Sequence, residues 1–172
     1  MKILITGTPG SGKTSIAKEL SKLLKLPYID VKKIIKNNPE TIDKKELGEL
    51  IINDKLKKVL SKNLPNSCVF ETHLIEYCPK NGLIIILRVN PLVLKKRLIK
   101  RGYSKQKIVD NLEVEILDYF TQNIKSNKVI EYDCSKGPAK INALKIKKLI
   151  QAKKYNKGGL KHKLSHIKKA LF

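Results

Sequence analysis

Glu71 and His73 lie two residues apart in the stretch FETHLIEYCP, which runs from Phe70 to Pro79 and begins with the end of a short apolar run. A carboxylate can orient Mg²⁺, directly or through water, and an imidazole can position a water or hold the carboxylate by a hydrogen bond. A loop histidine that bonds only to nearby backbone is the plain alternative. The chemistry of this pair therefore depends on whether a phosphate-binding element faces it.

The segment GTPGSGKT, from Gly7 to Thr14, matches the eight-residue phosphate-loop (P-loop) pattern. Glycines let backbone N–H groups turn toward a phosphate, and the N-terminus of the following helix adds unpaired donors and a favourable dipole. Lys13 can reach the β- and γ-phosphates, the Thr14 hydroxyl can ligate Mg²⁺, and Ser15 can support the α-phosphate. The motif predicts a nucleoside triphosphate site. Its expected binding residues are Gly10, Ser11, Gly12, Lys13, Thr14 and Ser15.

Five apolar, β-branched runs predict the strands that position these residues, at 2–6, 27–31, 67–72, 83–89 and 128–134. Apolar residues at helical spacing separate them, at 13–25, 32–63, 91–101, 104–124 and from about 138 onward. Within 32–63, Pro39 ends a first helix, and a second is expected over about 43–62. Strands that alternate with helices predict a parallel α/β sheet with helices on both faces, and the ligand then lies beyond the carboxyl ends of the strands.

Three arginines lie at the end of the fourth predicted strand or in the helix after it. Arg97 and Arg101 are four residues apart and so share one helical face, and Gly102 ends that helix. Two arginines at such a turn can close over a triphosphate and stabilise charge on the transferred phosphoryl group, whereas the alternative is a pair of solvated surface side chains. Arg88 ends the strand itself. It either faces the ligand or forms a strand-end salt bridge, and the sequence leaves both open.

The positive charge is concentrated at the end of the chain. The net charge is +22, and the last 39 residues contain twelve lysines and no acidic residue. This asymmetry favours a polyanion partner, RNA first, although the lysine-rich composition of the whole chain is an alternative cause. Three widely spaced cysteines without a CxxC motif predict reduced structural thiols. No apolar run has the ~20 residues of a membrane helix, and the start of the sequence is not a leader, so we expect a cytoplasmic protein without membrane association.

Four stretches together resemble the adenylate kinase isoenzyme 6 family, small archaeal and eukaryotic nucleotide kinases also described as ribosome-assembly ATPases. They are GTPGSGKT, ETHLIEYCP, ILRVNP and RLIKRGYSKQKIVDNLEVEI, of which the last is the most particular. The resemblance covers roughly residues 1–150. It implies the P-loop nucleoside monophosphate kinase fold, with a five-stranded parallel sheet, a monophosphate-binding insert at about 28–51 and a short lid at about 100–110. The kinase domain would span 1–155, followed by a basic tail at 156–172.

The resemblance also implies site residues. ATP and Mg²⁺ would be bound by the P-loop, with Arg101 on ATP and Lys13 and Arg101 in catalysis. The family places a D-x-H motif tied to ATP hydrolysis where this chain has Glu71-Thr72-His73. Glu71 and His73 would therefore be catalytic. Because glutamate is one methylene longer than the aspartate of the family motif, Glu71 is expected to contact the metal through water, beside Thr14.

The acceptor site departs from the family as well. Lys36 is the best match to an arginine of the insert, and the predicted substrate-binding residues are Lys36, Arg88 and Arg97. Lysine offers a point charge without the bidentate geometry of arginine. This weakens the case for tight AMP binding and favours ATPase activity. The adenine pocket is expected near the segment SKGP at 135–138.

The implied activity is ATP + AMP = 2 ADP, with ATPase activity, in small ribosomal subunit maturation. The expected partners are AMP or another nucleoside monophosphate, and a small-subunit ribosomal protein and rRNA bound by the basic surface and tail; the chain is expected to be a monomer. An alternative is an ATPase assembly factor with little kinase activity. A kinase for another small metabolite is a third hypothesis.

Overall fold

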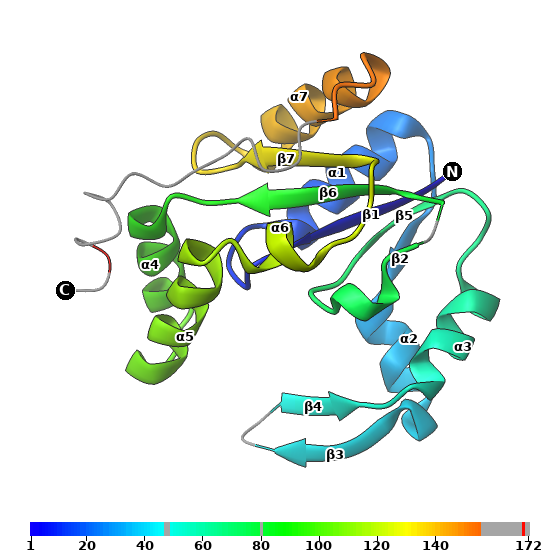
Figure 1. Cartoon of the computed structure of the whole chain (residues 1–172), viewed down its shortest axis with the longest axis horizontal. Helices are drawn as coiled ribbons and strands as arrows, with labels where there is room; N and C mark the ends of the chain where they lie inside the picture. The colour runs from blue at the N-terminus through cyan, green and yellow to red at the C-terminus, as the bar shows by residue number, and fades with distance from the viewer. Residues whose placement is uncertain (47–48, 80, 156–169, 171–172) are drawn as a thin grey trace.

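A five-stranded parallel sheet forms the centre of the protein (Figure 1). The computed structural model describes residues 1–46, 49–79, 81–155 and 170. The strands are β1 (Lys2–Gly7), β2 (Tyr28–Asp30), β5 (Cys68–Glu71), β6 (Leu83–Arg88) and β7 (Val129–Asp133). Their order is β2-β5-β1-β6-β7, and each neighbouring pair is parallel. All five strands were expected from the apolar runs, and their ends differ from the expected ends by at most one residue.

Helices cover both faces of the sheet, as predicted. One face packs against α1 (Lys13–Leu24), α4 (Pro91–Lys100), α5 (Lys105–Ile116) and α7 (Ala139–Gln151). The other packs against α2 (Val31–Asn37), α3 (Lys55–Asn63) and α6 (Tyr119–Asn123). Because successive strand residues point to opposite faces, Ile3 and Ile5 join the first core cluster and Leu4 joins the second. No helix in the described part of the chain is long and apolar enough to cross a membrane.

The helix expected over about 43–62 is wrong in its first half. A short 3₁₀ turn, η1 (Pro39–Thr41), leads into an antiparallel hairpin of β3 (Ile42–Glu46) and β4 (Glu49–Ile52), and only then does α3 begin. Ile42 and Ile52 pair across the hairpin and pack partly buried against the second core cluster. Both are β-branched, which favours a strand, so this pairing prevailed over a spacing that also fits a helix. Leu47, part of that spacing, lies outside the described residues.

The single helix expected over 104–124 is also wrong, because it is two helices. The break falls at Asp118, whose φ of 55° is left-handed, between α5 and α6. Aspartate tolerates this conformation better than most residues. The bend brings the Asp118 carboxylate to Arg88, with which it forms an ion pair.

The residue ranges expected for the insert and the lid contain the following elements. Residues 28–51 include β2, a strand of the main sheet, followed by α2, η1, β3 and most of β4, and the β3–β4 hairpin lies apart from the sheet at the bottom of Figure 1. The lid range contains the turn between α4 and α5, where Gly102 has a φ of 71° and Ser104 caps α5 by accepting a hydrogen bond from Lys107 N. A second 3₁₀ turn, η2 (Ile75–Tyr77), follows β5. The expected basic tail lies outside the described residues apart from Ala170.

Candidate active site

The P-loop follows β1, at the carboxyl edge of the sheet. Three of its glycines have positive φ, at 135° for Gly7, 91° for Gly10 and 95° for Gly12. A Cβ on Gly7 would lie 2.5 Å from Leu87 O of the neighbouring strand, so only glycine fits there. Gly12 starts α1 without a side-chain cap, which leaves the N-terminal N–H groups of this helix without a side-chain acceptor. This is the arrangement that binds a phosphate.

Lys13 folds back over the P-loop. Its Nζ donates hydrogen bonds to Gly7 O at 2.7 Å and Thr8 O at 3.2 Å. Burial lowers the pKa of Lys13 to about 8; Glu71 opposes this shift, and Lys32 and Arg101 add to it. Lys32 and Arg101, from two other parts of the fold, are thus electrostatic neighbours of Lys13. A bound triphosphate would neutralise them.

Sequence reasoning missed Lys32. The signal was its place in the chain, because it follows the last residue of β2, Asp30, by two positions and so stands at the ligand edge of the sheet. Lys36, the residue predicted from the family, lies exposed in the last turn of α2 and is not among the described residues that line the cavity beside the P-loop.

Glu71 meets the P-loop directly. Thr14 Oγ1 donates a hydrogen bond to Glu71 Oε1 at 3.0 Å. The two residues are brought together because β1 and β5 pair with Ile5 opposite Glu71, and Glu71 is the buried last residue of its strand. Mg²⁺ prefers oxygen ligands and is usually held by one or two side chains together with phosphates and waters, so this hydroxyl and carboxylate fit it. His73 lies exposed on the loop two residues further on.

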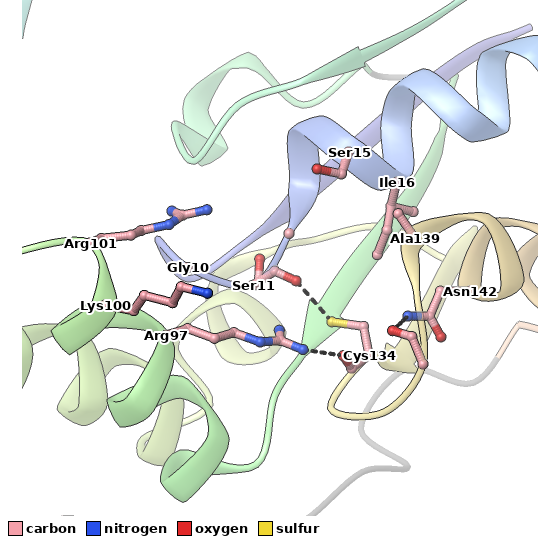
Figure 2. A pocket seen from close by; sticks show the side chains of 12 residues that line it. Gly10, Ser11, Ser15, Ile16, Arg97, Lys100, Arg101, Cys134, Ala139 and Asn142 are labelled. Carbon is pink, nitrogen blue, oxygen red and sulfur yellow. Dashed lines mark hydrogen bonds between the residues drawn. The ribbon is translucent and has the colours of Figure 1, made fainter.

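A cavity of about 470 Å³ opens beside the P-loop (Figure 2). The backbone and side chains of Gly10, Ser11, Gly12 and Ser15 line one side of it, and the end of α4 lines another. Ser11 Oγ is buried without a protein hydrogen-bond partner in the described structure, as expected of a group that bonds to a ligand. Lys13 and Thr14 are not part of this lining: Lys13 bonds to the P-loop carbonyls, and Thr14 bonds to Glu71.

The two lid arginines are placed differently. Arg97, Lys100 and Arg101 all line the cavity. Arg97 reaches across it, and its Nη2 donates to Cys134 O at 3.0 Å and Ser135 O at 3.4 Å. Arg101 is instead an electrostatic neighbour of Lys13. The α4 end therefore brings one arginine to the loop after β7 and the other to the P-loop lysine.

The opposite wall is the loop between β7 and α7, where the adenine pocket was expected. Gly137, Ala139 and the buried Asn142 line the cavity there. Asn142 Nδ2 donates to Gly137 O at 3.2 Å, and its Oδ1 accepts from Tyr132 Oη at 2.9 Å, which fixes the loop on α7. Sequence reasoning missed Asn142, because an asparagine inside an amphipathic helix carries no motif.

Cys134, also missed, ties this wall to the P-loop. Its Sγ donates to Ser11 O at 3.1 Å and to Arg88 O at 3.2 Å. Burial raises the pKa of the Cys134 thiol to about 12, against the effect of nearby Arg97, so the thiol is a neutral donor. The three cysteines are free, and Cys68 and Cys134 are buried, in agreement with the expected structural thiols.

Arg88 forms the strand-end salt bridge, the second of the two alternatives. Only 4% of its side chain is exposed, and its Nε donates to Glu115 Oε1 at 2.8 Å. Its other nitrogens pair with Asp118 and approach Glu131 Oε2 to 3.8 Å. The guanidinium is thus engaged inside the protein by three carboxylates, and the expectation that it reaches a substrate is not met in this geometry.

Comparison with known proteins shows the family of the chain. Residues 3–118 match the family model described as an AAA domain. A "Putative adenylate kinase" of Methanococcus maripaludis is 35% identical over 153 residues, which is 82% of this chain and 84% of the relative. One of the same name from Methanocaldococcus jannaschii is 34% identical over 162 residues, 92% of this chain and 90% of the relative.

Solved structures agree on the fold. Shikimate kinase from Acinetobacter baumannii, in complex with shikimate, has a TM-score of 0.63 at 21% identity, over 90% of this chain and 95% of that chain. Shikimate kinase from Bacteroides thetaiotaomicron has a TM-score of 0.62 at 18% identity, over 88% of this chain and 98% of that chain. The predicted P-loop kinase fold is confirmed. The chain therefore belongs to the AAA-domain family and to the group of P-loop kinases that the archaeal adenylate kinase relatives represent.

Proposed function

We propose that the protein is an adenylate kinase-type nucleoside monophosphate kinase, which catalyses ATP + AMP = 2 ADP and also hydrolyses ATP with Mg²⁺. The observation that carries the proposal is the hydrogen bond from Thr14 to Glu71 next to Lys13, whose ammonium is held on the P-loop carbonyls and has Lys32 and Arg101 as electrostatic neighbours. Phosphoryl transfer requires positive charge around the moving group and a metal site next to it, with little other chemistry from the protein. The archaeal relatives carry a name for the same reaction.

Each cation has a distinct task in this proposal. Mg²⁺, when bound, would supply positive charge that neutralises part of the charge of the phosphates. Thr14 would offer it a hydroxyl, and Glu71, hydrogen-bonded to Thr14, would orient its water. Lys13 would leave the carbonyls of Gly7 and Thr8 for the β- and γ-phosphates, and Arg101 would stabilise charge on the transferred group.

The acceptor would lie on the α2 side of Lys13. Lys32, at the start of α2, would face the acceptor phosphate, and Lys36, one turn later, would extend the same positive charge. Arg97 would contact ATP in the cavity while it holds the loop after β7. His73 would position a water for hydrolysis when no acceptor is present.

A coupled assay tests the activity. ADP formation is measured from ATP alone and with each of a panel of nucleoside monophosphates, for the wild type and His73→Ala. We expect AMP to raise the rate of ADP formation, and His73→Ala to lose hydrolysis while transfer to AMP is kept. A panel in which no monophosphate raises the rate above that of ATP alone would refute the kinase assignment.

We further propose membership of the adenylate kinase isoenzyme 6 family and a role in small ribosomal subunit maturation. The alternative keeps that role and drops most of the kinase activity. One observation favours it: the insert contains lysines where monophosphate kinases commonly use arginine. A second supports a polyanion partner in either case. Exposed lysines gather on and beside α7, at Lys136, Lys140, Lys145, Lys148, Lys153 and Lys154.

A measurement of RNA affinity tests whether these lysines bind RNA or only reflect the lysine-rich composition of the chain. The affinity for a small-subunit rRNA fragment is measured at several salt concentrations for the full chain, for a chain without residues 156–172, and for Lys140→Gln/Lys148→Gln. Each lost phosphate contact should flatten the salt dependence of the affinity, with a slope change of about 0.7–0.9. Equal affinities of all three proteins at low and high salt would show that these lysines do not contribute to RNA binding.

A further inference from the structure

A buried carboxylate outside the cavity is attached to the P-loop. Glu115, in the last turn of α5, has a side chain that is 1% exposed. Its Oε2 accepts a hydrogen bond from Thr8 Oγ1 at 2.5 Å. Its Oε1 accepts from Arg88 Nε at 2.8 Å and from Val89 N at 3.1 Å. The carboxylate thus joins the residue after β1 to the end of β6, two adjacent strands of the sheet.

Thr8 connects this carboxylate to the catalytic lysine. It is fully buried, and its carbonyl accepts hydrogen bonds from Lys13 Nζ at 3.2 Å and from Ser11 N at 3.0 Å. The residue whose hydroxyl meets Glu115 therefore also forms the turn of the P-loop and holds the ammonium of Lys13. A displacement of Thr8 would move both the phosphate-binding turn and the lysine.

Arg88 and Asp118 hold the carboxylate in turn. The guanidinium of Arg88 donates to the Glu115 carbonyl at 3.2 Å as well as to its side chain, and it pairs with Asp118 at the break between α5 and α6. Charge-assisted hydrogen bonds of this kind are about twice as strong as neutral ones, and in the interior they restrict the side chains to one geometry. Glu115 is thereby fixed relative to the sheet.

We propose that Glu115 is a positioning residue that acts through Thr8: it holds the P-loop turn that carries Lys13 and so links the lid helix α5 to phosphoryl transfer. The inference rests on the proposed phosphoryl-transfer function. It also links the P-loop to a helix that begins at the lid turn, since α5 starts at Lys105, after its cap Ser104, and carries Glu115 in its last turn. Misplacement of a catalytic group by about 1 Å can cost on the order of 10²-fold in rate.

The test removes the Thr8 hydroxyl and then returns it. Thr8→Val replaces the hydroxyl with a methyl group, and Thr8→Ser keeps the hydroxyl without the methyl group. Turnover of ATP, with and without AMP, and the melting temperature are measured for each, and the affinity for a non-hydrolysable ATP analogue is measured by calorimetry. We expect Thr8→Val to lower kcat by roughly tenfold to a hundredfold with a smaller change in analogue affinity, and Thr8→Ser to remain within about threefold of the wild type.

Thr121→Val is the matched control. Thr121 Oγ1 accepts from Arg88 Nη1 at 3.4 Å, so its removal disturbs the same ion cluster away from the P-loop. We expect this variant to keep the wild-type kcat. Should Thr8→Val fail to fold, Thr8→Ala and Thr8→Ser differ by the hydroxyl alone and give the same comparison.

The outcomes separate the inference from the function on which it rests. Wild-type kcat in Thr8→Val, or equal losses of kcat and melting temperature in Thr8→Val and Thr121→Val, would show that the cluster is only structural. If AMP adds nothing to wild-type turnover, the kinase proposal fails, and the Thr8 variants are then compared on ATP hydrolysis. A wild-type protein that turns over no ATP overturns both.

Discussion

The hydroxyl of Thr14 donates to the carboxylate of Glu71 across the gap between α1 and β5, at 3.0 Å. This bond joins the P-loop to the end of β5, where Glu71 is followed by His73. In the proposed function this bond defines the role of Glu71, since a carboxylate that holds a metal-ligating hydroxyl or its neighbouring water tunes how tightly the metal binds.

Glu71→Gln should weaken the dependence of turnover on Mg²⁺. The amide keeps the size of the side chain but loses its charge, and the loss of such an outer partner costs about 10–100-fold in metal affinity. The measurement is the Mg²⁺ concentration at half-maximal ATP turnover. Glu76→Gln, an exposed acid in η2, is the control and should behave as the wild type. An unchanged Mg²⁺ requirement in Glu71→Gln would remove Glu71 from the metal site.

The affinity for ATP should fall as the pH rises through about 8. Lys13 has a folded-state pKa of about 8, lowered from 10.5, so the free protein loses this charge above that pH. Binding of the triphosphate favours the charged form, and the affinity then decreases by up to about tenfold per pH unit. Calorimetric titration between pH 7 and pH 9 measures this. Lys13→Met should bind weakly with little pH dependence, and an equal slope in that variant would assign the titration to another group.

The same pKa predicts the effect of Lys13 on stability. Between pH 8 and 10.5 the unfolded chain holds a proton on this lysine that the folded protein has released. Since the unfolded state then binds more protons, the contribution of Lys13 to the free energy of unfolding rises with pH in this window. The free energy of unfolding is measured in urea at pH 8 and at pH 10. From pH 8 to pH 10 it should rise less, or fall more, in Lys13→Met than in the wild type.

Arg101→Met and Arg97→Met should have different kinetic effects. Arg101 neighbours Lys13, so its removal should lower kcat by about 10²-fold, as expected of a lost transition-state donor. Arg97 holds the carbonyls of Cys134 and Ser135, so its removal should raise the KM for ATP with kcat within about threefold. Steady-state kinetics with saturating AMP distinguish the two. Identical profiles would contradict the division of the lid arginines.

Arg88→Met should destabilise the protein. The change leaves Glu115, Asp118 and Glu131 without their shared cation, and removal of one partner from a buried ion pair costs about 3–5 kcal/mol. Chemical unfolding monitored by circular dichroism measures the loss. A variant of normal stability with a raised KM for AMP would return Arg88 to the substrate site.

The sheet and the P-loop were predictable because their signals are local. Apolar runs such as residues 83–89 mark buried strands in any parallel sheet, and the P-loop motif fixes which edge binds the ligand. The hairpin of β3 and β4 was not predictable, because its short apolar spacing fits a helix equally well and the contact of Ile42 and Ile52 with the second core cluster decides between them. The break at Asp118 depends on Arg88, which is 30 residues away in the chain.

The candidate site likewise contains residues that a local motif predicts and residues that only the packing of the fold brings there. Lys13, Thr14 and Glu71 follow from a motif and a strand end, and the structure brings them together. Lys32, Asn142 and Cys134 stand in no motif, and they reach the site only through the packing of α2, α7 and the loop after β7. Arg88 shows the limit most plainly. The sequence gives its strand, but the choice between ligand and salt bridge depends on carboxylates from α5, α6 and β7.

The contact of Gly10 with α4 limits how the nucleotide cavity can be redesigned. A Cβ at Gly10 would lie 2.9 Å from Leu94 Cδ1 and 3.0 Å from Leu98 Cδ2, so the floor of the cavity has no spare volume. On the opposite side of the cavity, Gly137 and the neighbouring Pro138 are solvent-exposed. A nucleotide analogue with a bulky substituent should therefore be accommodated on the Gly137 side of the cavity rather than beside Gly10.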